Sequence, residues 1–359
     1  MSRVYLDHNA TTPLRPEARE AMLRAMDVVG NPSSVHAEGR AAKAIVEKAR
    51  AQVAALLGID RNEVVFTSGA TEAAELACAG QKVTCANVEH DAVRVHQTHV
   101  LPVDQNGEVI PFEAVTGTVL AVQGANSETG ALQNNFRWAQ VAWQSGAHVL
   151  VDAVQLAGKV RTSVADLGAD FAMLSAHKLG GPKGVGALCL KLGVDVPAQI
   201  RGGGQEMGRR SGTENVIGIA GFGAAAEAAQ RDVADGKWAR VEKLRNILEN
   251  ALADVSKTTI FVGKEAPRLP NTSCFITPGW KGETQVMQMD LAGFAISAGS
   301  ACSSGKVKAS HVLKAMGYSE LEASSAVRVS LGLDTTEDDV LRFAEVWAQK
   351  LKKHEARAA

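Results

Sequence analysis

The sequence predicts an α/β protein with a mostly parallel central sheet, followed by a second, smaller α/β unit. Strand-like and helix-like runs alternate through residues 63–191, an order that favours parallel strands joined by crossover helices. The strand-like runs are apolar throughout, which is typical of strands covered on both faces. After about Gly212 the composition changes to long stretches rich in Ala, Glu and Arg, and this change indicates the second unit.

The elements of the first part follow from local composition. Ala, Arg, Glu and Leu dominate residues 16–29 and 38–57, which we expect to be helices, and Pro16 stands where a first helical turn tolerates proline. Short apolar runs predict strands, and the segments between them predict two more helices. The expected strands are 63–67, 82–86, 118–122, 148–152, 170–175 and 186–191, and the further helices are 71–79 and 136–145.

The second part carries a different pattern. Residues 216–250 predict long helices, and a domain boundary is expected near residues 230–245. Strands near 273–277 and 327–331 follow, with helices near 283–291 and 307–316, a Gly/Ser stretch at 297–305 and a final helix from Glu337.

Composition excludes several classes of function. The chain has 359 residues, with 38 basic and 39 acidic side chains and a net charge of -1. This balance disfavours nucleic-acid binding, because neutralising phosphates needs a basic surface. No apolar run reaches the roughly 18 residues of a spanning helix, and the first residues lack the cationic flank and apolar block of a secretory signal. We therefore expect a soluble, cytoplasmic protein that engages neither membrane nor nucleic acid.

Of the five cysteines, no two form a CxxC pair, which disfavours a disulfide scaffold or zinc ribbon. Four lie in apolar surroundings, whereas Cys302 lies in the small, flexible stretch SAGSACSSGK. We expect Cys302 to be exposed, and the nearby Lys306 and Lys308 to favour its thiolate. A flexible loop can carry a thiolate in and out of a site, so we interpret Cys302 as functional.

Two charged residues follow neighbouring strands. Lys178 lies in SAHKLGGPKGVGAL, directly after an apolar strand, and Asp152 closes the preceding strand in HVLVDAVQLAGK. Ligands of open parallel sheets bind beyond the carboxyl ends of the strands, and a right-handed crossover would bring both residues to one crevice. A Schiff-base lysine with an acidic partner for a pyridinium nitrogen is the minimal pyridoxal phosphate site. Taken singly, Lys178 or Lys183 fits a surface lysine and Asp152 fits a helix N-cap.

A phosphate site is indicated by FTSGATE, residues 66–72, in which a strand runs into Ser-Gly-Ala-Thr and a helix begins. Backbone N–H groups at that helix start, together with the Thr71 hydroxyl, would hold a phosphate. Ser175 and His177 would supply further hydrogen bonds. The alternative is that Thr71 acts only as an N-cap.

Three further observations concern histidine and arginine. His90 follows a strand-like run and would stack on a cofactor ring and move protons near neutral pH, although a lone histidine is often structural. Arg328 lies inside the apolar run VRVSLG and needs an anionic partner, either an amino-acid carboxylate or a structural Asp or Glu. His90, His96 and His99 lack a Cys or carboxylate at ligand spacing, so no metal site is expected.

Taken together, these motifs closely resemble cysteine desulfurases of the NifS/IscS type, which are pyridoxal phosphate enzymes related to the class V aminotransferases. The resemblance covers nearly the whole chain, and the segments SAHK and GSAC are its most specific parts. It rests on YLDHNATTP, NPSSVHAEG, FTSGATE, EHDAV, DAVQLAGK, SAHKLGGPKG, GGGQEMGRRSGTEN, GSACSSG and RVSLG.

The resemblance implies a fold-type-I pyridoxal phosphate-dependent transferase with two domains. Residues 14–240 would form the large domain that binds pyridoxal phosphate, around a mostly parallel sheet. Residues 1–13 and 241–359 would form the smaller α/β domain, which carries the mobile loop with Cys302.

The resemblance also implies a role for each matching residue. Lys178 matches the Schiff-base lysine and proton shuttle, Cys302 the nucleophile that takes sulfur, and Arg328 the clamp for the substrate carboxylate. Asp152 matches the partner of the pyridine nitrogen, Gln155 the contact to the phenolic oxygen, and His90 the ring-stacking acid or base. Ala70, Thr71, Ser175 and His177 match the phosphate cup, and Thr213 matches a residue donated to the partner subunit's phosphate.

One departure concerns the segment before Glu-x-Gly, where the family usually has two asparagines. Here the residues are Asn126 and Ser127, so the cofactor contact is expected from one of these two.

The function implied is conversion of L-cysteine to L-alanine, with the sulfur held as a persulfide on Cys302. Iron–sulfur scaffold proteins or other sulfur acceptors would be the partners, and a role for Thr213 across subunits implies a homodimer. A class V aminotransferase, which needs no loop thiol, and a selenocysteine lyase on the same fold are the alternatives.

Overall fold

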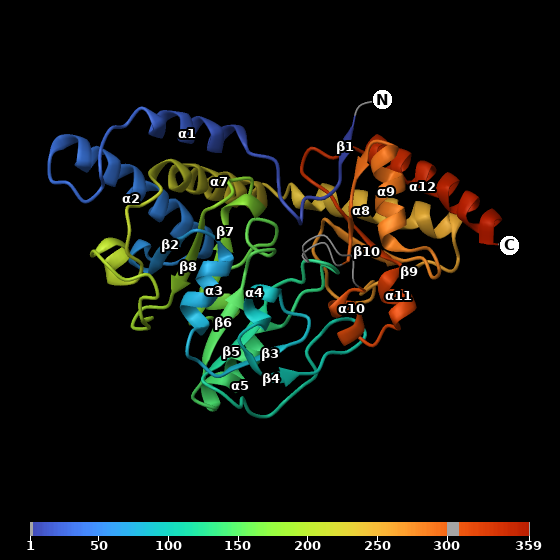
Figure 1. Cartoon of the computed structure of the whole chain (residues 1–359), viewed down its shortest axis with the longest axis horizontal. Helices are drawn as coiled ribbons and strands as arrows, with labels where there is room; N and C mark the ends of the chain where they lie inside the picture. The colour runs from blue at the N-terminus through green and yellow to red at the C-terminus, as the bar shows by residue number, and fades with distance from the viewer. Residues whose placement is uncertain (1–2, 300–308, 359) are drawn as a thin grey trace.

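The computed structural model describes residues 3–299 and 309–358. Its largest sheet has seven strands in the order β2-β8-β7-β6-β5-β3-β4 (Figure 1). The neighbours from β4 to β7 pair in parallel, and β8 runs antiparallel to both β7 and β2. The strands are β2 (Val64–Thr67), β3 (Val83–Ala86), β4 (Gln97–Leu101), β5 (Val119–Gln123), β6 (His148–Asp152), β7 (Phe171–Ser175) and β8 (Gly186–Leu190). The expected mostly parallel sheet is confirmed.

Side chains of these strands alternate between two apolar layers. Phe66 and Val122 belong to a core that also contains residues of α2, α5 and α7, whereas Val65 and Leu150 belong to a core with α3. Because successive strand residues point to opposite faces, helices cover the sheet on both sides. The helices are α1 (Pro16–Met26), α2 (Ala37–Leu57), α3 (Ala70–Cys78), α4 (Asp91–Arg94), α5 (Asn135–Gln144), α6 (Val164–Leu167) and α7 (Val216–Ala234).

Most predicted elements of this part are confirmed to within one or two residues, but α1 is shorter than expected. It ends at Met26 rather than at residue 29, and Asp27 is its C-cap. The next residues, Val28 to Gly30, are poor helix formers because two are β-branched and the third is glycine. Strand β4 was not expected.

The second sheet has four antiparallel strands in the order β12-β13-β10-β9. It consists of β9 (Ile260–Phe261), β10 (Thr272–Ile276), β12 (Ser297–Ala298) and β13 (Ala326–Ser330). Helices α8 (Trp238–Val255), α9 (Gly282–Leu291) and α12 (Glu337–Ala358) pack with it around Phe275, Trp280 and Trp347. The strands expected at 273–277 and 327–331 are confirmed to within one residue, and so are the helices expected at 283–291 and from Glu337.

Two short helices, α10 (His311–Ala315) and α11 (Glu320–Ser324), complete this part of the molecule. The helix expected over 307–316 begins later, because Ser310 caps α10 by accepting a hydrogen bond from the Leu313 N–H. Residues 307 and 308 lie outside the described residues.

The N-terminal strand β1 (Val4–Tyr5) pairs in parallel with β11 (Phe294–Ala295), so the first residues lie beside α9 and α12 (Figure 1). The chain then runs from β1 toward the seven-stranded sheet, where the Thr12 N–H donates to the His177 carbonyl. The division into domains at residue 240 stays a prediction. Within the described residues, no helix has the length and apolar character needed to cross a membrane.

Candidate active site

A cavity of about 570 Å³ lies beyond the carboxyl ends of β6 and β7. Asp152 ends β6, and Ser175 ends β7, which is its parallel neighbour. This is the edge at which open parallel sheets bind their ligands. Polar side chains from both sheets converge on the cavity: Asn9, Thr71, His90, Gln123, Ser127, Asp152, Gln155, Ser175, His177, Lys178, Lys183 and Arg328.

Lys178 closes a short 3-10 turn, η2 (Ala176–Lys178), which follows β7 directly. Its Nζ donates to two backbone carbonyls of the N-terminal segment, those of Asn9 at 2.6 Å and Ala10 at 2.9 Å. The amine is therefore held at the cavity by residues near the start of the chain.

Asp152 lies in the same cavity as Lys178, as the crossover between β6 and β7 requires. Its Oδ1 accepts a hydrogen bond of 2.9 Å from the Val154 N–H, so it also caps the turn that follows β6. Burial raises the pKa of its carboxyl, while the Val154 N–H, His90 and Lys178 favour the charged form. A cationic group bound opposite this carboxyl would be strongly favoured.

The start of α3 forms another wall of the cavity. Gly69 precedes this helix and offers no capping side chain, so the first N–H groups, at Ala70 and Thr71, are available to an anion. The turn packs closely on β8, because a Cβ on Gly186 would lie 2.6 Å from the Gly69 carbonyl carbon. Only glycine allows this approach.

His177 lies beside Ser175 at the same wall, with its Nδ1 3.1 Å from the Thr11 hydroxyl. Burial lowers the pKa of His177 to about 4, and the ammonium groups of Lys178 and Lys183 add to this effect. The ring is therefore neutral near pH 7 and acts as a hydrogen-bonding group rather than as a cation.

His90 caps the short helix α4, because its Nδ1 accepts a 3.1 Å hydrogen bond from the Ala92 N–H. A nitrogen that accepts carries no proton, so in the neutral ring the proton is assigned to Nε2. His90 also lines the cavity.

Arg328 has the structural partner that the sequence left open. Its Nη2 lies 2.6 Å from Asp7 Oδ1, and its Nη1 donates to the Ser127 carbonyl at 3.0 Å. The Nε has no hydrogen-bond partner among residues 3–299 and 309–358, although Arg328 is nearly buried and lines the cavity. The guanidinium is thus oriented by Asp7, and its Nε–H has no partner among the described residues.

Asn126 and Ser127 have different surroundings. The Asn126 amide is used within its own turn, because its Oδ1 accepts from the N–H groups of Glu128 and Thr129 and its Nδ2 donates to Val88 O. Ser127, and not Asn126, lines the cavity. Thr213 is exposed and lines not this cavity but a smaller one, which shares Ser68 and Gly184 with it.

The comparisons agree with this geometry. The sequence profile of the class-V aminotransferases matches residues 4–343. The chain belongs to this family. A cysteine desulfurase of Cereibacter sphaeroides is 40% identical to it, over 96% of this chain and 95% of its own length. A cysteine desulfurase IscS of Dictyoglomus turgidum is 35% identical, over 98% and 95%.

A solved structure, the NifS-like protein from Rickettsia africae, has a TM-score of 0.89 and 32% identity, and the match covers 98% of this chain and 99% of that one. The resemblance drawn from the motifs is confirmed, and so is the fold-type-I α/β architecture. The class-V aminotransferases use pyridoxal phosphate.

Sequence reasoning missed the ion pairs that hold the turn before α3 in this class-V aminotransferase. Arg50 forms a bidentate pair with Glu206 at 2.6 and 2.8 Å, and Glu206 Oε2 also accepts from the Phe66 N–H. Arg210 donates to Glu72 in the first turn of α3 at 2.8 Å. The segment that carries Thr213 is therefore fixed to the turn that lines the cavity. Partners this distant in sequence leave no local signal.

Four of the five cysteines in this class-V aminotransferase are buried, as their apolar surroundings predicted. Burial raises the pKa of the Cys78, Cys189 and Cys274 thiols to about 12 and also raises that of Cys85. These four are poor nucleophiles at neutral pH. Cys302 lies outside the described residues.

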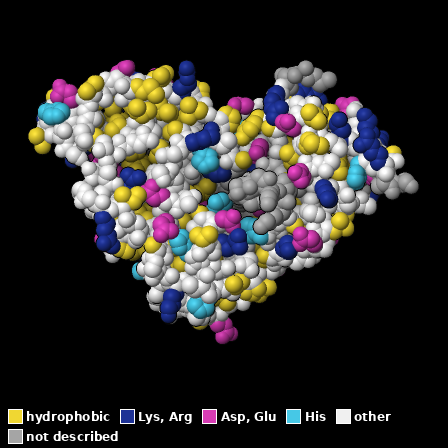
Figure 2. Space-filling view, in the orientation of Figure 1, with side chains coloured by type: hydrophobic (Ala, Val, Ile, Leu, Met, Phe, Trp, Pro, Cys, Tyr) yellow, Lys and Arg dark blue, Asp and Glu magenta, His cyan; other side chains and the backbone are white. Residues whose placement is uncertain are grey.

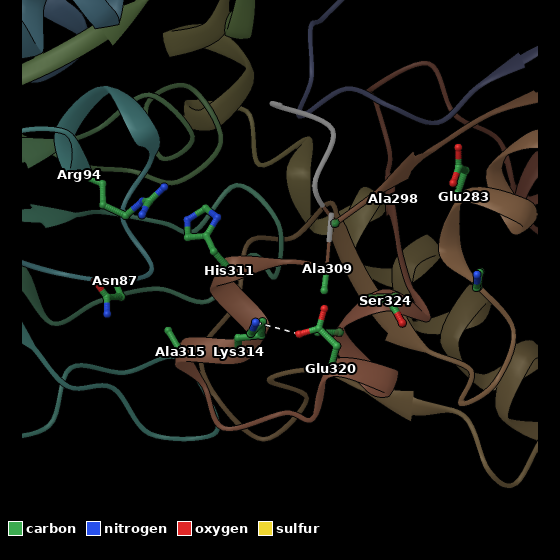
Figure 3. Close-up of a pocket in the computed structure, with 14 residues that line it drawn as sticks. Asn87, Arg94, Glu283, Ala298, Ala309, His311, Lys314, Ala315, Glu320 and Ser324 are labelled. Atoms are coloured by element: carbon green, nitrogen blue, oxygen red, sulfur yellow. Dashed lines mark ion pairs between the residues drawn. The ribbon is translucent and has the colours of Figure 1, made fainter. Parts of the chain in front are cut away.

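A second cavity, of about 810 Å³, lies between α4 and the helices α9, α10 and α11. Figure 3 shows the Arg94 guanidinium directed toward the His311 ring, and a 2.8 Å ion pair between Lys314 and Glu320. Burial, with a smaller effect of Arg94, lowers the pKa of His311. The residues that border segment 300–308 also line this cavity: Ala298, Gly299 and Ala309. Among the described residues, no three His, Cys, Asp or Glu side chains form a group able to hold a metal ion.

Glu128 is a fully buried carboxyl that follows Ser127, a residue of the 570 Å³ cavity. Its Oε2 accepts a 2.5 Å hydrogen bond from the Ser310 hydroxyl, and a Cβ on Gly299 would lie 3.1 Å from the same oxygen. Burial raises the pKa of Glu128 from 4.5 to about 7, although Ser310 and Arg328 favour the charged form. The folded protein therefore keeps a proton that the unfolded chain releases between these pH values.

Because of this retained proton, the contribution of Glu128 to stability is lost as pH rises through about 7. In the Glu128→Gln variant this side chain does not titrate. The free energy of unfolding of the variant, relative to that of the wild type, should therefore rise by roughly 3 kcal/mol between about pH 4.5 and pH 8. Urea unfolding of both proteins across this range measures the difference. Parallel curves would contradict the assignment.

Proposed function

We propose that the protein is a pyridoxal phosphate-dependent cysteine desulfurase, which converts L-cysteine to L-alanine and retains the sulfur as a persulfide on Cys302. The observation that carries the proposal is the cavity itself, where an amine, a buried carboxylate and a helix N-terminus face one space. Relatives that are 35 to 40% identical to this chain are named cysteine desulfurases, which supports the same reaction.

The residues around the cavity fit pyridoxal phosphate, group by group. The Lys178 amine would take the aldehyde carbon, and the Asp152 carboxylate would face the ring nitrogen. Gln155 would contact the ring oxygen, His90 would lie on the ring face, and either Asn126 or Ser127 would complete the contacts, with Ser127 favoured by its place at the cavity. The phosphate would be held by Ala70, Thr71, Ser175 and His177. When bound, this cofactor supplies an electron sink for charge that develops at the amino acid Cα.

The remaining groups act on the substrate. Lys178 removes the Cα proton of the substrate and later returns it, since its amine is a base that lies in this cavity. Arg328, oriented by Asp7, binds the substrate carboxylate through its free Nε–H. The Nε2–H of His90 supplies a second proton donor.

Sulfur transfer follows as a nucleophilic displacement. The Cys302 thiolate attacks the sulfur of the bound cysteine, so that an S–S bond forms and the Cβ–S bond breaks. The electron pair of the broken bond stays on Cβ, which takes a proton and leaves as the methyl group of alanine. The sum is L-cysteine plus a protein thiol giving L-alanine plus a protein persulfide.

Two partners complete the proposal. Hydrophobic side chains gather around α1 in Figure 2. The exposed apolar residues of this stretch are Leu23 and Met26 of α1 and, in the segment that follows it, Val29 and Val35, and such a surface suits a second copy of the chain. In that homodimer Thr213 would reach the partner's phosphate site, and sedimentation should give twice the chain mass.

The persulfide would pass to an iron–sulfur scaffold or another sulfur acceptor. This acceptor would approach near Gly299 and Ala309.

A single turnover tests the function. The enzyme, loaded with pyridoxal phosphate and free of reductant, is mixed with L-cysteine, alanine is quantified, and the added sulfur is located by peptide mass. We expect one alanine per site and a mass increase of about 32 Da, one sulfur atom, on the Cys302 peptide. Cofactor binding without alanine, followed by amino transfer to a keto acid, would favour a class V aminotransferase instead.

A further inference from the structure

Lys159 is a buried lysine that has no carboxylate partner among the residues that the structure describes. It is 5% exposed and lies one helical turn after Gln155, in the turn that follows β6. Its Nζ donates to Gln155 Oε1 at 2.7 Å and to Asn9 Oδ1 at 3.3 Å. Both partners are neutral amide oxygens, and its charged neighbours are the cations Lys178 and Arg328.

This environment disfavours the ammonium form. An unpaired buried cation costs several kcal/mol, and two neighbouring cations increase that cost. Burial therefore lowers the pKa of Lys159 well below its usual value, and Lys178 and Arg328 lower it further. Asp7 is paired with Arg328. Burial lowers the pKa of His8, which interacts electrostatically with Lys159, to about 4, so its ring is neutral near pH 7. A neutral amine has two N–H donors, which match the two amide oxygens.

The contact with Lys159 fixes which way the Gln155 amide points. Because Oε1 accepts from Lys159, Nε2 lies on the other side, where it donates to the Asn9 carbonyl at 2.9 Å. The reversed amide would place an N–H against the Lys159 donors and an oxygen against the carbonyl, and both contacts would be repulsive. Gln155 is therefore a donor, and not an acceptor, toward the cavity that it lines.

Asn9 joins this arrangement to the reactive lysine. Its carbonyl accepts from both Gln155 Nε2 and Lys178 Nζ, at 2.9 and 2.6 Å. Its side chain is held in turn by Asn271, which donates to Oδ1 at 3.1 Å, and by Thr272, which accepts from Nδ2 at 2.9 Å. Lys159 thus belongs to a buried network that ends at the two groups facing the cofactor.

We propose that Lys159 is a positioning residue that holds the Gln155 amide with its Nε2 as a hydrogen-bond donor to the ring oxygen of the cofactor. This inference rests on the proposed function, since it needs the cofactor in the cavity. A donated hydrogen bond stabilises negative charge on the ring oxygen, so the proton next to that oxygen is released at a lower pH. Loss of Lys159 lets the amide turn and removes this effect.

The test is the pH midpoint of the visible absorption band of the cofactor-loaded protein. Lys159→Met, which has similar length and no donor, should raise the midpoint by about one pH unit, the size of one hydrogen bond. Gln155→Leu should give a similar shift, and the double variant should shift no further, because both changes remove the same contact. Lys159→Gln, which keeps an N–H donor, should shift less. Lys191→Met is the control without a shift, because Lys191 is exposed and pairs with Asp170, at the opposite end of β7 from Lys178.

A wild-type midpoint in Lys159→Met, beside a shifted one in Gln155→Leu, would overturn the inference. Additive shifts in the double variant would overturn it as well. Should the methionine variant fail to fold, Lys159→Leu replaces it under the same criteria. Failure of the proposed function is distinguishable, because the wild type would then release no alanine from L-cysteine, whereas the inference is judged on the pH midpoint of the visible band alone.

Discussion

Replacing Cys302 with alanine is expected to abolish persulfide formation and to lower alanine production on the order of 10³-fold or more, because no other thiol can take its place. The four remaining cysteines are buried, and their pKa values are raised by burial. A thiol of pKa about 12 is almost entirely protonated at neutral pH and has no path to a substrate sulfur.

The measurement is a single turnover with L-cysteine, with alanine and peptide mass as readouts. Cys78→Ala is the matched control, since it removes a buried thiol in α3 and leaves the proposed nucleophile in place. The cofactor band should be unchanged in Cys302→Ala, which shows that the cavity is intact. Wild-type alanine production by that variant would contradict the proposed sulfur transfer.

Replacing Lys178 with alanine is expected to remove covalent attachment of the cofactor and to lower activity on the order of 10³-fold or more, because the same amine also moves the Cα proton. The position of the amine is decided by backbone, since Asn9 and Ala10 carbonyls hold it at the cavity. Reduction with borohydride followed by peptide mass locates the attachment.

Lys183→Ala is the matched control for attachment, because Lys183 lines the same cavity five residues further along the chain. It should keep the cofactor mass on the Lys178 peptide after reduction. Cofactor found on Lys183, or an unchanged attachment in Lys178→Ala, would refute the assignment of the reactive lysine.

The central sheet was predictable because its signal is local. Strands such as β5 and β7 are buried along their whole length, so apolar runs alone mark them. Strand β4 was not predicted because it is an edge strand in which exposed residues, Thr98 and Val100, alternate with more buried ones. Its residues QTHVL carry too little apolar character to predict a strand.

The candidate site was predictable where motifs carry it, and not where distant partners do. Asp152 and Lys178 follow strands that the sequence marks, and they do line one cavity. The partner of Arg328 was left open, because Asp7 stands at the other end of the chain. Lys159 lies within the segment DAVQLAGK, but the sequence indicated no role for it, since only the fold shows that its neighbours are amide oxygens.

The pairing of β1 with β11 has a consequence for synthesis of the chain. Val4 pairs with Phe294, so the first strand leaves the ribosome long before its partner exists. At roughly 5 to 20 residues per second, the nascent chain waits about 15 to 60 s before that pair can form. Because Arg328 of β13 also lines the cavity, the cavity is completed only when translation has nearly ended. The cofactor is therefore expected to load after release, onto a finished chain.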